Sequence, residues 1–181
     1  EEGGFEMLLE CARFYYSLLL RRADGRLCEI HDVVGPDEYH ERVDNNAYTN
    51  RMAKYVLEKG AEQLAALLDQ GLRPDPGGCL REELDRFRTA AAQLYIPQPA
   101  ADGVIEQFDG YFRLEDVGVE EVRSRLLHPK EYWGGANGVA GHTQVIKQAD
   151  VVAMLGMFPE DYSREIQLAN WQYYEPRTEH G

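Results

Sequence analysis

Residues 35–50 hold the densest group of side chains that could carry out acid–base chemistry. They read GPDEYHERVDNNAYTN, a Gly-Pro turn followed by acids, amides and aromatic rings. A carboxyl group whose pKa is raised by burial or by neighbouring carboxylates donates a proton near neutral pH. Tyr39 and Tyr48 interleave with the acids, as in clefts that bind sugar rings. A solvated surface loop has a similar composition, so these residues alone leave both interpretations open.

Two further polar residues, Lys147 and Gln148, interrupt the apolar segment 145–153. We expect a helix over residues 143–158, which places the pair close to the start of that helix. An ammonium and an amide could hydrogen-bond sugar hydroxyls. The simpler interpretation, from sequence alone, is that Lys147 lies on a solvated helix face.

The histidines and cysteines give no indication of a metal centre. Three cysteines are scattered along the chain without the spacing of a zinc site or a disulfide framework, which favours reduced thiols in a cytoplasmic protein. Four histidines share no spacing with acids or cysteines that would predict a metal cage. These histidines are His31, His40, His128 and His142.

The elements that must position these residues are predicted to be helices. Apolar residues recur at helical spacing, whereas the strand signal is poor throughout, so we expect an all-α fold of about six helices with long functional loops. Asn45 or Asn46 is suited to cap the second helix. Residues 26–34 are expected to be extended, and residues 73–78 to form a loop. The predicted helices run from Phe5 to a break at residues 24–25, then over 46–70, 81–94, 119–127, 143–158 and from Pro159 to about Tyr173.

Composition excludes several classes of protein. Nineteen Lys and Arg against 32 Asp and Glu give a net charge of −13, which argues against binding to nucleic-acid phosphates or an anionic membrane. An apolar share of 44% suffices for a core. The longest apolar stretches, residues 14–20 and 151–158, are far shorter than the roughly 20 residues of a membrane span. The chain does not begin with Met, and we expect both ends to be cuts within a longer protein.

Four motifs carry a resemblance to a known family. The segments 35–50, 107–112, 144–151 and 173–178 resemble, in the same order, segments of glycoside hydrolase family 65, the maltose, trehalose and kojibiose phosphorylases. The resemblance implies that residues 1–181 are a partial catalytic domain of a larger enzyme, truncated at both ends. It also implies that these helices are part of an (α/α)₆ barrel. The family's Trp-Asp and Ser-Ser motifs have no counterpart within the chain.

The resemblance implies roles for four residues. Glu38 matches the general acid, Lys147 and Gln148 match the glucose site, and His180 matches the start of the loop that holds phosphate. No metal or organic cofactor is implied, since inorganic phosphate is the co-substrate. The implied partners are a disaccharide and phosphate, with the full-length protein forming a homodimer.

The activity implied is inverting phosphorolysis of an α-glucosidic disaccharide to β-glucose 1-phosphate and a free sugar. A hydrolase of the same family is the alternative, and Glu179 could then serve as the base that activates water. A third possibility is that the fragment is inactive on its own.

The remaining candidates have weaker support. Trp133 and Asn137 could line the mouth of the barrel. Residues 107–112 are expected to pack beneath a loop, with Asp109 as the exception. Glu175 and Arg177 could form a structural ion pair at the base of the phosphate loop.

Overall fold

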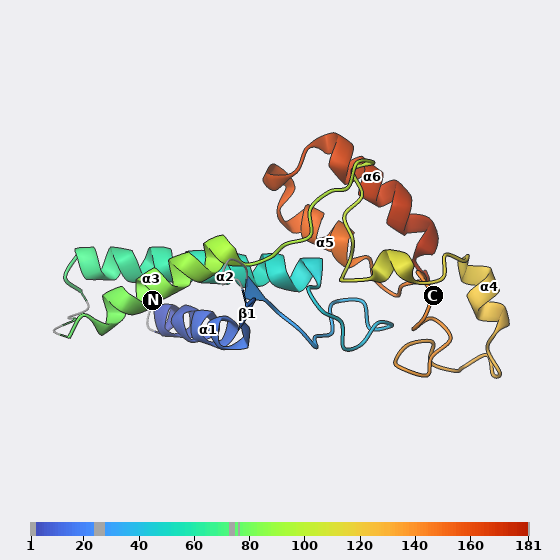
Figure 1. The fold of residues 1–181 in the computed structure, drawn as a ribbon, viewed down its shortest axis with the longest axis horizontal. Helices are drawn as coiled ribbons and strands as arrows, with labels where there is room; N and C mark the ends of the chain where they lie inside the picture. The colour runs from blue at the N-terminus through green and yellow to red at the C-terminus, as the bar shows by residue number, and fades with distance from the viewer. Residues whose placement is uncertain (1–2, 24–27, 73–74, 76, 181) are drawn as a thin grey trace. The chain divides into compact units, whose positions relative to one another are not determined.

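The computed structural model describes residues 3–23, 28–72, 75 and 77–180, and helices dominate it (Figure 1). Within that part of the chain six α-helices occur, which confirms the predicted all-α class. One short antiparallel pair, β1 (Leu20–Arg21) with β2 (Cys28–Glu29), accompanies them. The helices are α1 (Gly4–Leu18), α2 (Ala47–Asp69), α3 (Cys79–Gln93), α4 (Val119–Ser124), α5 (Asp150–Met157) and α6 (Arg164–Tyr174), with 3₁₀ turns η1 (Tyr111–Arg113), η2 (Pro159–Asp161) and η3 (Glu175–Arg177).

The chain forms two compact units, each with its own core. The first unit comprises Glu1–Ile30 and Asn50–Tyr95, and the second comprises His31–Thr49 and Ile96–Gly181. All the residues predicted to act in chemistry lie in the second unit.

In the first unit, α1, α2 and α3 pack side by side (Figure 1). The helical spacing of their apolar residues gives each helix one buried face. Arg13 on α1 makes a two-pronged ion pair with Glu83 on α3, at 2.7 and 2.8 Å. The buried core residues are Leu9, Ala12, Leu57, Ala61, Leu64, Leu68, Leu84, Phe87, Ala90 and Ala91.

The start of α2 is fixed by a side-chain cap. The Oδ1 atom of Asn46 accepts a hydrogen bond from the backbone N–H of Thr49 at 2.9 Å. This bond satisfies one of the amides that have no partner within the first turn of a helix. Of the two predicted caps, Asn46 is therefore the one used, and the bounds predicted for this helix are confirmed to within one residue.

The second unit packs α5 and α6 around two buried tyrosines. The hydroxyl of Tyr174 donates to the backbone oxygen of Ile105, and that of Tyr111 donates to the backbone oxygen of Gln144, each at 2.6 Å. Burial raises the pKa of both hydroxyls well above the ordinary value, so they remain donors. The expectation that residues 107–112 pack beneath a loop agrees with the burial of Gln107, Phe108 and Tyr111.

The helix predicted over residues 143–158 is wrong in its first half, since α5 begins only at Asp150. Residues 143–149 are irregular because three of their amides bond to distant segments and not to the preceding turn of a helix. The N–H groups of Gln144, Ile146 and Lys147 bind the backbone oxygen of Glu115, the backbone oxygen of Arg177 and a carboxylate oxygen of Asp37. Lys147 and Gln148 therefore lie before the helix.

The last helix also begins later than predicted. Pro159 starts the short turn η2, and α6 begins at Arg164 with the Oγ of Ser163 accepting from the N–H of Ile166 at 3.4 Å. Proline fits the first position of such a turn because its missing N–H has no partner there.

Some predictions fall outside the described residues. The break at residues 24–25, the first part of the extended stretch 26–34, and positions 73, 74 and 76 of the predicted loop are among them. The rest of the extended stretch includes β2.

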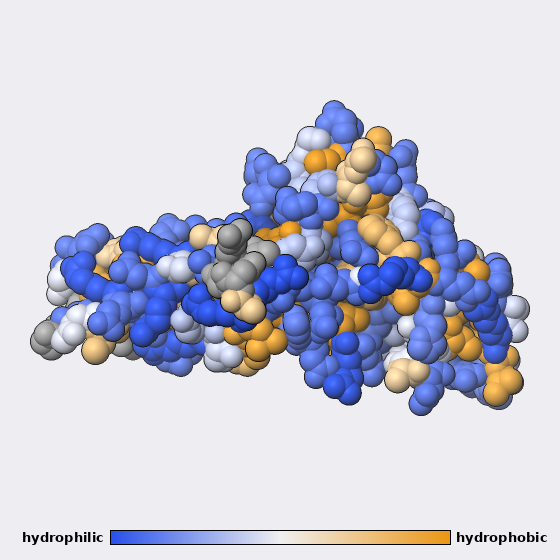
Figure 2. Space-filling view, viewed as in Figure 1, coloured by the Kyte–Doolittle hydropathy of each residue, from blue (hydrophilic) through white to orange (hydrophobic). Residues whose placement is uncertain are grey.

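Hydrophilic residues cover most of the face shown in Figure 2, with apolar patches between them. No helix in the described ranges is both long and apolar enough to cross a bilayer.

Candidate active site

The loop that precedes α2 turns two consecutive acids in opposite directions. The side chain of Asp37 is 1% exposed, whereas that of Glu38 is 56% exposed. Gly35 makes this turn possible, because a Cβ there would meet the carboxyl of Asp150 and the amide of Asn46. The loop therefore presents one acid outward and buries the other.

Glu38 contacts Lys147, and the family resemblance implies a role in the active site for each of them. The ammonium Nζ of Lys147 donates to Oε2 of Glu38. This hydrogen bond raises the pKa of Lys147, so the ammonium stays charged. The hydroxyl of Tyr132 donates to the backbone oxygen of Glu38 at 2.6 Å and holds the loop beside the pair. Gln148, the next residue along the chain, is exposed.

Asp37 accepts four hydrogen bonds from inside the protein. Its Oδ1 accepts from the backbone N–H groups of Tyr39 at 3.2 Å and Lys147 at 2.9 Å. Its Oδ2 accepts from Nδ1 of His40 at 2.7 Å and from Nε2 of Gln107 at 3.1 Å. One buried carboxylate therefore joins the loop of the acid to the segment that carries Lys147.

His40 lies between two acceptors. Its Nδ1 faces the carboxylate of Asp37, and its Nε2 lies 2.9 Å from the backbone oxygen of Thr143. A carbonyl and an ionised carboxylate can only accept, so making both bonds requires a proton on each ring nitrogen. The rings of Phe108 and Tyr111 pack against the imidazole, which is 4% exposed. Both ring nitrogens of His40 are therefore used inside the protein, one on the buried carboxyl of Asp37 and one on the backbone of Thr143.

A second buried carboxyl completes this network. Asp150 accepts from the backbone N–H of Asp37 at 2.6 Å and from Nδ2 of Asn46 at 2.7 Å. Its own N–H donates to Oε1 of Gln107 at 3.2 Å. Burial raises the pKa of Asp150 to about 7, because desolvation outweighs these two hydrogen bonds and the nearby charge of Asp37 adds to it.

The segment that ends in His180 runs beside Lys147. Ile146, the residue before Lys147, donates its N–H to the backbone oxygen of Arg177 at 3.0 Å and accepts from the N–H of Glu179 at 2.8 Å. His180 itself is exposed, with Nε2 3.7 Å from a carboxylate oxygen of Glu175. The predicted phosphate segment and the predicted glucose segment are thus hydrogen-bonded neighbours.

Glu179 is held by two donors. The hydroxyl of Tyr39 donates to its Oε2 and the guanidinium of Arg123 to its Oε1, each at 3.4 Å. Burial, followed by the charge of Glu179, raises the pKa of Tyr39 to about 12, so its hydroxyl stays protonated. The ring of Trp133 stacks on Tyr39 with 5.9 Å between centroids, and it lines a surface pocket together with Arg123 and Glu179.

One predicted contact has a different partner. Arg177 pairs with Asp116, at 2.9 and 3.1 Å, and its guanidinium lies 4.0 Å from the ring centre of Tyr173. The proposed ion pair of Arg177 with Glu175 is therefore wrong, because the nearby Asp116 offers a two-pronged contact. Asn137 is exposed in the glycine-rich loop.

The remaining weak candidate, Asp109, accepts from Nδ2 of Asn45 at 2.8 Å, and its N–H donates to the backbone oxygen of Asp44. These contacts give it a place in the structure of the loop.

Sequence reasoning did not identify the buried members of the network. From the sequence, Asp37 counts only among the carboxylates that neighbour Glu38, and His40 only among the histidines without the spacing of a metal site. Gln107 and Asp150 are the other two residues that it missed. Gln107 directly precedes Phe108, and Asp150 directly precedes the apolar run 151–155. A polar side chain beside apolar residues is a signal for a buried hydrogen bond.

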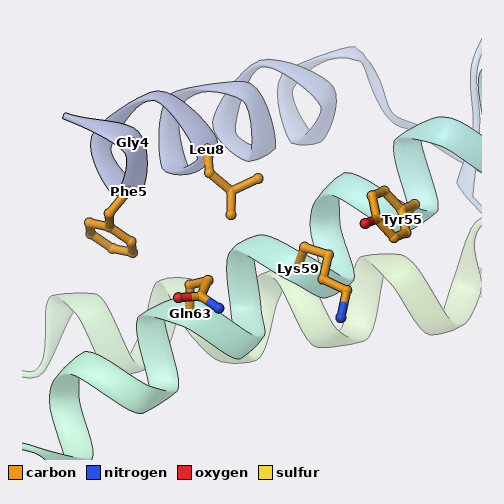
Figure 3. A pocket seen from close by; sticks show the side chains of 6 residues that line it. All are labelled: Gly4, Phe5, Leu8, Tyr55, Lys59 and Gln63. Carbon is orange, nitrogen blue, oxygen red and sulfur yellow. The ribbon is translucent and has the colours of Figure 1, made fainter. Parts of the chain in front are cut away.

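Another pocket lies in the first unit, between α1 and α2 (Figure 3). Phe5 and Leu8 line it from α1, while Tyr55, Lys59 and Gln63 line it from α2. These residues offer packing surface without a carboxyl group for acid catalysis. Among the residues with described positions, none form a cluster of His, Cys, Asp and Glu that could hold a metal ion.

Comparison with known proteins identifies relatives along the whole chain. The chain is 57% identical to the nigerose phosphorylase of Lachnoclostridium phytofermentans, over 99% of this chain and 25% of that protein. It is 41% identical to the 1,2-alpha-glucosylglycerol phosphorylase of Bacillus selenitireducens, over 98% of this chain and 24% of that protein. The chain thus spans about a quarter of the length of the curated relatives it matches.

A solved structure from the human microbiome, assigned as a kojibiose phosphorylase, matches with a TM-score of 0.80 and 29% identity. The match covers 98% of this chain and 26% of that one. This likeness agrees with the expected part of an (α/α)₆ barrel. All of residues 1–181 match the model of the "Glycosyl hydrolase family 65 central catalytic domain". The chain therefore belongs to glycoside hydrolase family 65, within its central catalytic domain.

Proposed function

We propose that the protein containing this chain catalyses inverting phosphorolysis of an α-glucosidic disaccharide, with Glu38 as the general acid. The observation that carries the proposal is the pairing of Glu38 with Lys147, on a segment hydrogen-bonded to the one that ends in His180. An acid, a sugar-binding cation and a phosphate-binding imidazole are the groups that this reaction needs. The names of the relatives, all phosphorylases of glucosyl compounds, support the same reaction.

The chemical step requires one proton donor and one nucleophile. Glu38 gives its proton to the glycosidic oxygen as the bond from that oxygen to the anomeric carbon breaks. A phosphate oxygen attacks the anomeric carbon from the opposite face, so the α-linked glucosyl group becomes β-glucose 1-phosphate. The proton that the attacking hydrogen phosphate loses restores the acid form of Glu38, which closes the cycle.

The ion pair of Glu38 with Lys147 represents a resting arrangement in this proposal. A carboxylate that accepts from an ammonium carries no proton, so it cannot act as an acid until that contact is exchanged. We propose that glucosyl hydroxyls take over the ammonium of Lys147, together with the amide of Gln148. Binding of the sugar then leaves the carboxyl of Glu38 free to be protonated beside the glycosidic oxygen.

The names of the relatives, all phosphorylases, favour phosphate over water as the nucleophile. An inverting hydrolase needs a second carboxylate free to activate water. Glu179, which the sequence offered for this task, is already bound by Tyr39 and Arg123. Phosphate is an anion that needs only donors and positive charge to hold it, and His180 is the residue we propose for that role.

The experiment that tests this function is product analysis with the full-length protein. Nigerose and kojibiose are incubated with and without inorganic phosphate, and the anomeric form of the product is followed by NMR. We expect β-glucose 1-phosphate in the presence of phosphate and negligible glucose in its absence. Release of free glucose at the same rate without phosphate would overturn the proposal in favour of hydrolysis.

A further inference from the structure

The buried carboxylate of Asp37 is the strongest feature of the second unit that the proposed reaction does not use. It is adjacent to the acid in the sequence yet points away from it, and it is almost wholly buried. Buried carboxylates are rare unless paired and hydrogen-bonded, and Asp37 is both. Its contacts therefore indicate a specific role.

The contacts of Asp37 bracket the pair formed by Glu38 and Lys147. Its Oδ1 binds the N–H of Tyr39, the residue after the acid, and also the N–H of Lys147. The same oxygen atom thus fixes the backbone on both sides of the pair. A shift of this carboxylate would move Glu38 relative to Lys147, because Oδ1 holds the amide that follows the acid and the amide of Lys147 at the same time.

The other oxygen of Asp37 is locked in turn. His40 binds Oδ2 and, through its second nitrogen, the backbone oxygen of Thr143, where the irregular segment 143–149 begins. Gln107 binds the same Oδ2 and also accepts from the N–H of Asp150, where that segment ends. The carboxylate of Asp37 therefore binds the middle of this segment directly, at Lys147. It holds the beginning of the segment through His40 and the end through Gln107.

From this geometry we propose that Asp37 is a positioning residue, which sets the general acid Glu38 and the sugar-binding Lys147 at a fixed separation through its four hydrogen bonds. The inference rests on the proposed function. Asp37 acts through other residues and is buried beneath the site, so it does not touch the reacting atoms. Catalytic rates depend steeply on such placement, since small displacements of a reacting group cost large factors in rate.

Asp37→Asn is the variant that tests this role. It keeps the shape of the side chain but replaces Oδ2 with an NH₂ group that faces two donors, His40 and Gln107. The imidazole of His40 can accept at Nδ1 while it donates at Nε2, whereas Gln107 cannot turn around without pointing its NH₂ group at the N–H of Asp150. In the variant the NH₂ group of the new asparagine therefore faces the NH₂ group of Gln107, and the carboxamide must shift.

Comparing two glucosyl donors separates a loss of acid positioning from a loss of folded protein. The full-length protein is assayed with phosphate on a disaccharide and on α-glucosyl fluoride, whose leaving group needs little help from an acid. We expect kcat for the disaccharide to fall about 100-fold in Asp37→Asn. We expect kcat for the fluoride to fall by no more than about tenfold. A role in stability alone would lower both rates by the same factor.

Asn170→Asp is the matched control, because Asn170 is equally buried in the same unit and bonds only Ile105, Gly103 and Ile166. We expect this control to leave the ratio of the two rates unchanged.

Gln107→Met removes one of the four bonds with little change in volume, so it serves if Asp37→Asn does not fold. It should shift the ratio in the same direction by a smaller factor.

The outcomes also separate this inference from the proposed function. A wild-type protein that lacks phosphate-dependent turnover of either donor refutes the proposed function, and the inference falls with it. A wild-type protein active on both donors, with the same ratio of rates in Asp37→Asn and Gln107→Met, overturns the inference alone.

Discussion

At positions 37 and 38 two chemically similar side chains have opposite surroundings. Asp37 is buried and accepts from four donors, while Glu38 reaches Lys147 at the surface. The shorter side chain of Asp37 is bound by nearby backbone and side-chain donors, whereas the longer one of Glu38 extends outward. Two consecutive acids thus have different proposed roles, positioning for Asp37 and proton donation for Glu38.

The first prediction concerns Glu38. We expect Glu38→Gln in the full-length protein to lower kcat on a disaccharide by about 10² to 10⁴, since the amide has no proton to give to the leaving oxygen. Substrate binding should be retained, because the amide has nearly the same shape. Steady-state kinetics on nigerose with phosphate measure both quantities. Near-normal turnover of the unactivated disaccharide in this variant would show that Glu38 is not the acid.

The second prediction concerns the stability of the fold and Asp150. Its pKa is about 7 in the folded protein against an ordinary value of 3.8. Between those values the folded state holds a proton that the unfolded chain has released. The contribution of this proton to the free energy of unfolding is therefore complete below about pH 4. It is lost as the pH rises towards 7, at no more than about 1.4 kcal/mol per pH unit.

Urea unfolding at pH 5 and pH 7 measures this effect when wild type is compared with Asp150→Asn. The variant has no titrating group at this position, so we expect its stability to fall less between the two values. Comparing the change in the free energy of unfolding between pH 5 and pH 7 in the two proteins cancels the effect of other titrating groups. An equal change in both proteins would contradict the shifted pKa of Asp150.

At the scale of elements, helices α1 and α2 approach closely at one glycine. A Cβ added at Gly60 would lie 2.7 Å from the Cβ of Ala12, which is closer than two such atoms come in proteins. Glycine in the middle of a helix costs about 1 kcal/mol relative to alanine. Its presence here is explained by the space that it leaves for the facing helix.

The third prediction follows from this contact. We expect Gly60→Ala to lower the free energy of unfolding by about 1 kcal/mol, since overpacking costs about 1–3 kcal/mol and exceeds the gain in helix propensity. Combining it with Ala12→Gly should relieve the clash, so that the double variant loses less stability than the two single variants together. Denaturant unfolding of all four proteins gives the coupling directly. Strict additivity would mean that the two helices do not meet at this point.

At the scale of the whole molecule, each unit has its own apolar core, and the candidate site lies entirely in the second. Leu64 of α2 is fully buried in the core of the first unit, whereas Leu72, just beyond the same helix, is 67% exposed. The two leucines are chemically identical and differ in burial, so they form a matched pair for measuring what that core contributes.

The fourth prediction is that Leu64→Ala destabilises the protein by about 2–5 kcal/mol, from lost burial and the cavity that remains. Leu72→Ala should change stability by less than about 0.5 kcal/mol. Urea unfolding, followed by circular dichroism, compares the two variants. Similar losses in both would show that the three-helix core does not form as described.

The sequence by itself predicted the helical class and the bounds of the long helix α2. Helical periodicity over 23 residues is a strong local signal, and an asparagine before it marks the start. The family's motifs imply active-site roles for Glu38 and Lys147, whereas their direct contact is seen only in the structure.

Only the tertiary structure decided that residues 143–149 are not helical and that Asp37 is buried beneath the acid. Both outcomes depend on partners far along the chain. The amides of this segment bond to Glu115, Arg177 and Asp37, and the carboxylate of Asp37 bonds to Gln107, 70 positions away. Local propensity favours a helix in such an apolar segment. The prediction fails here because local propensity takes no account of hydrogen bonds that form only when distant segments come together.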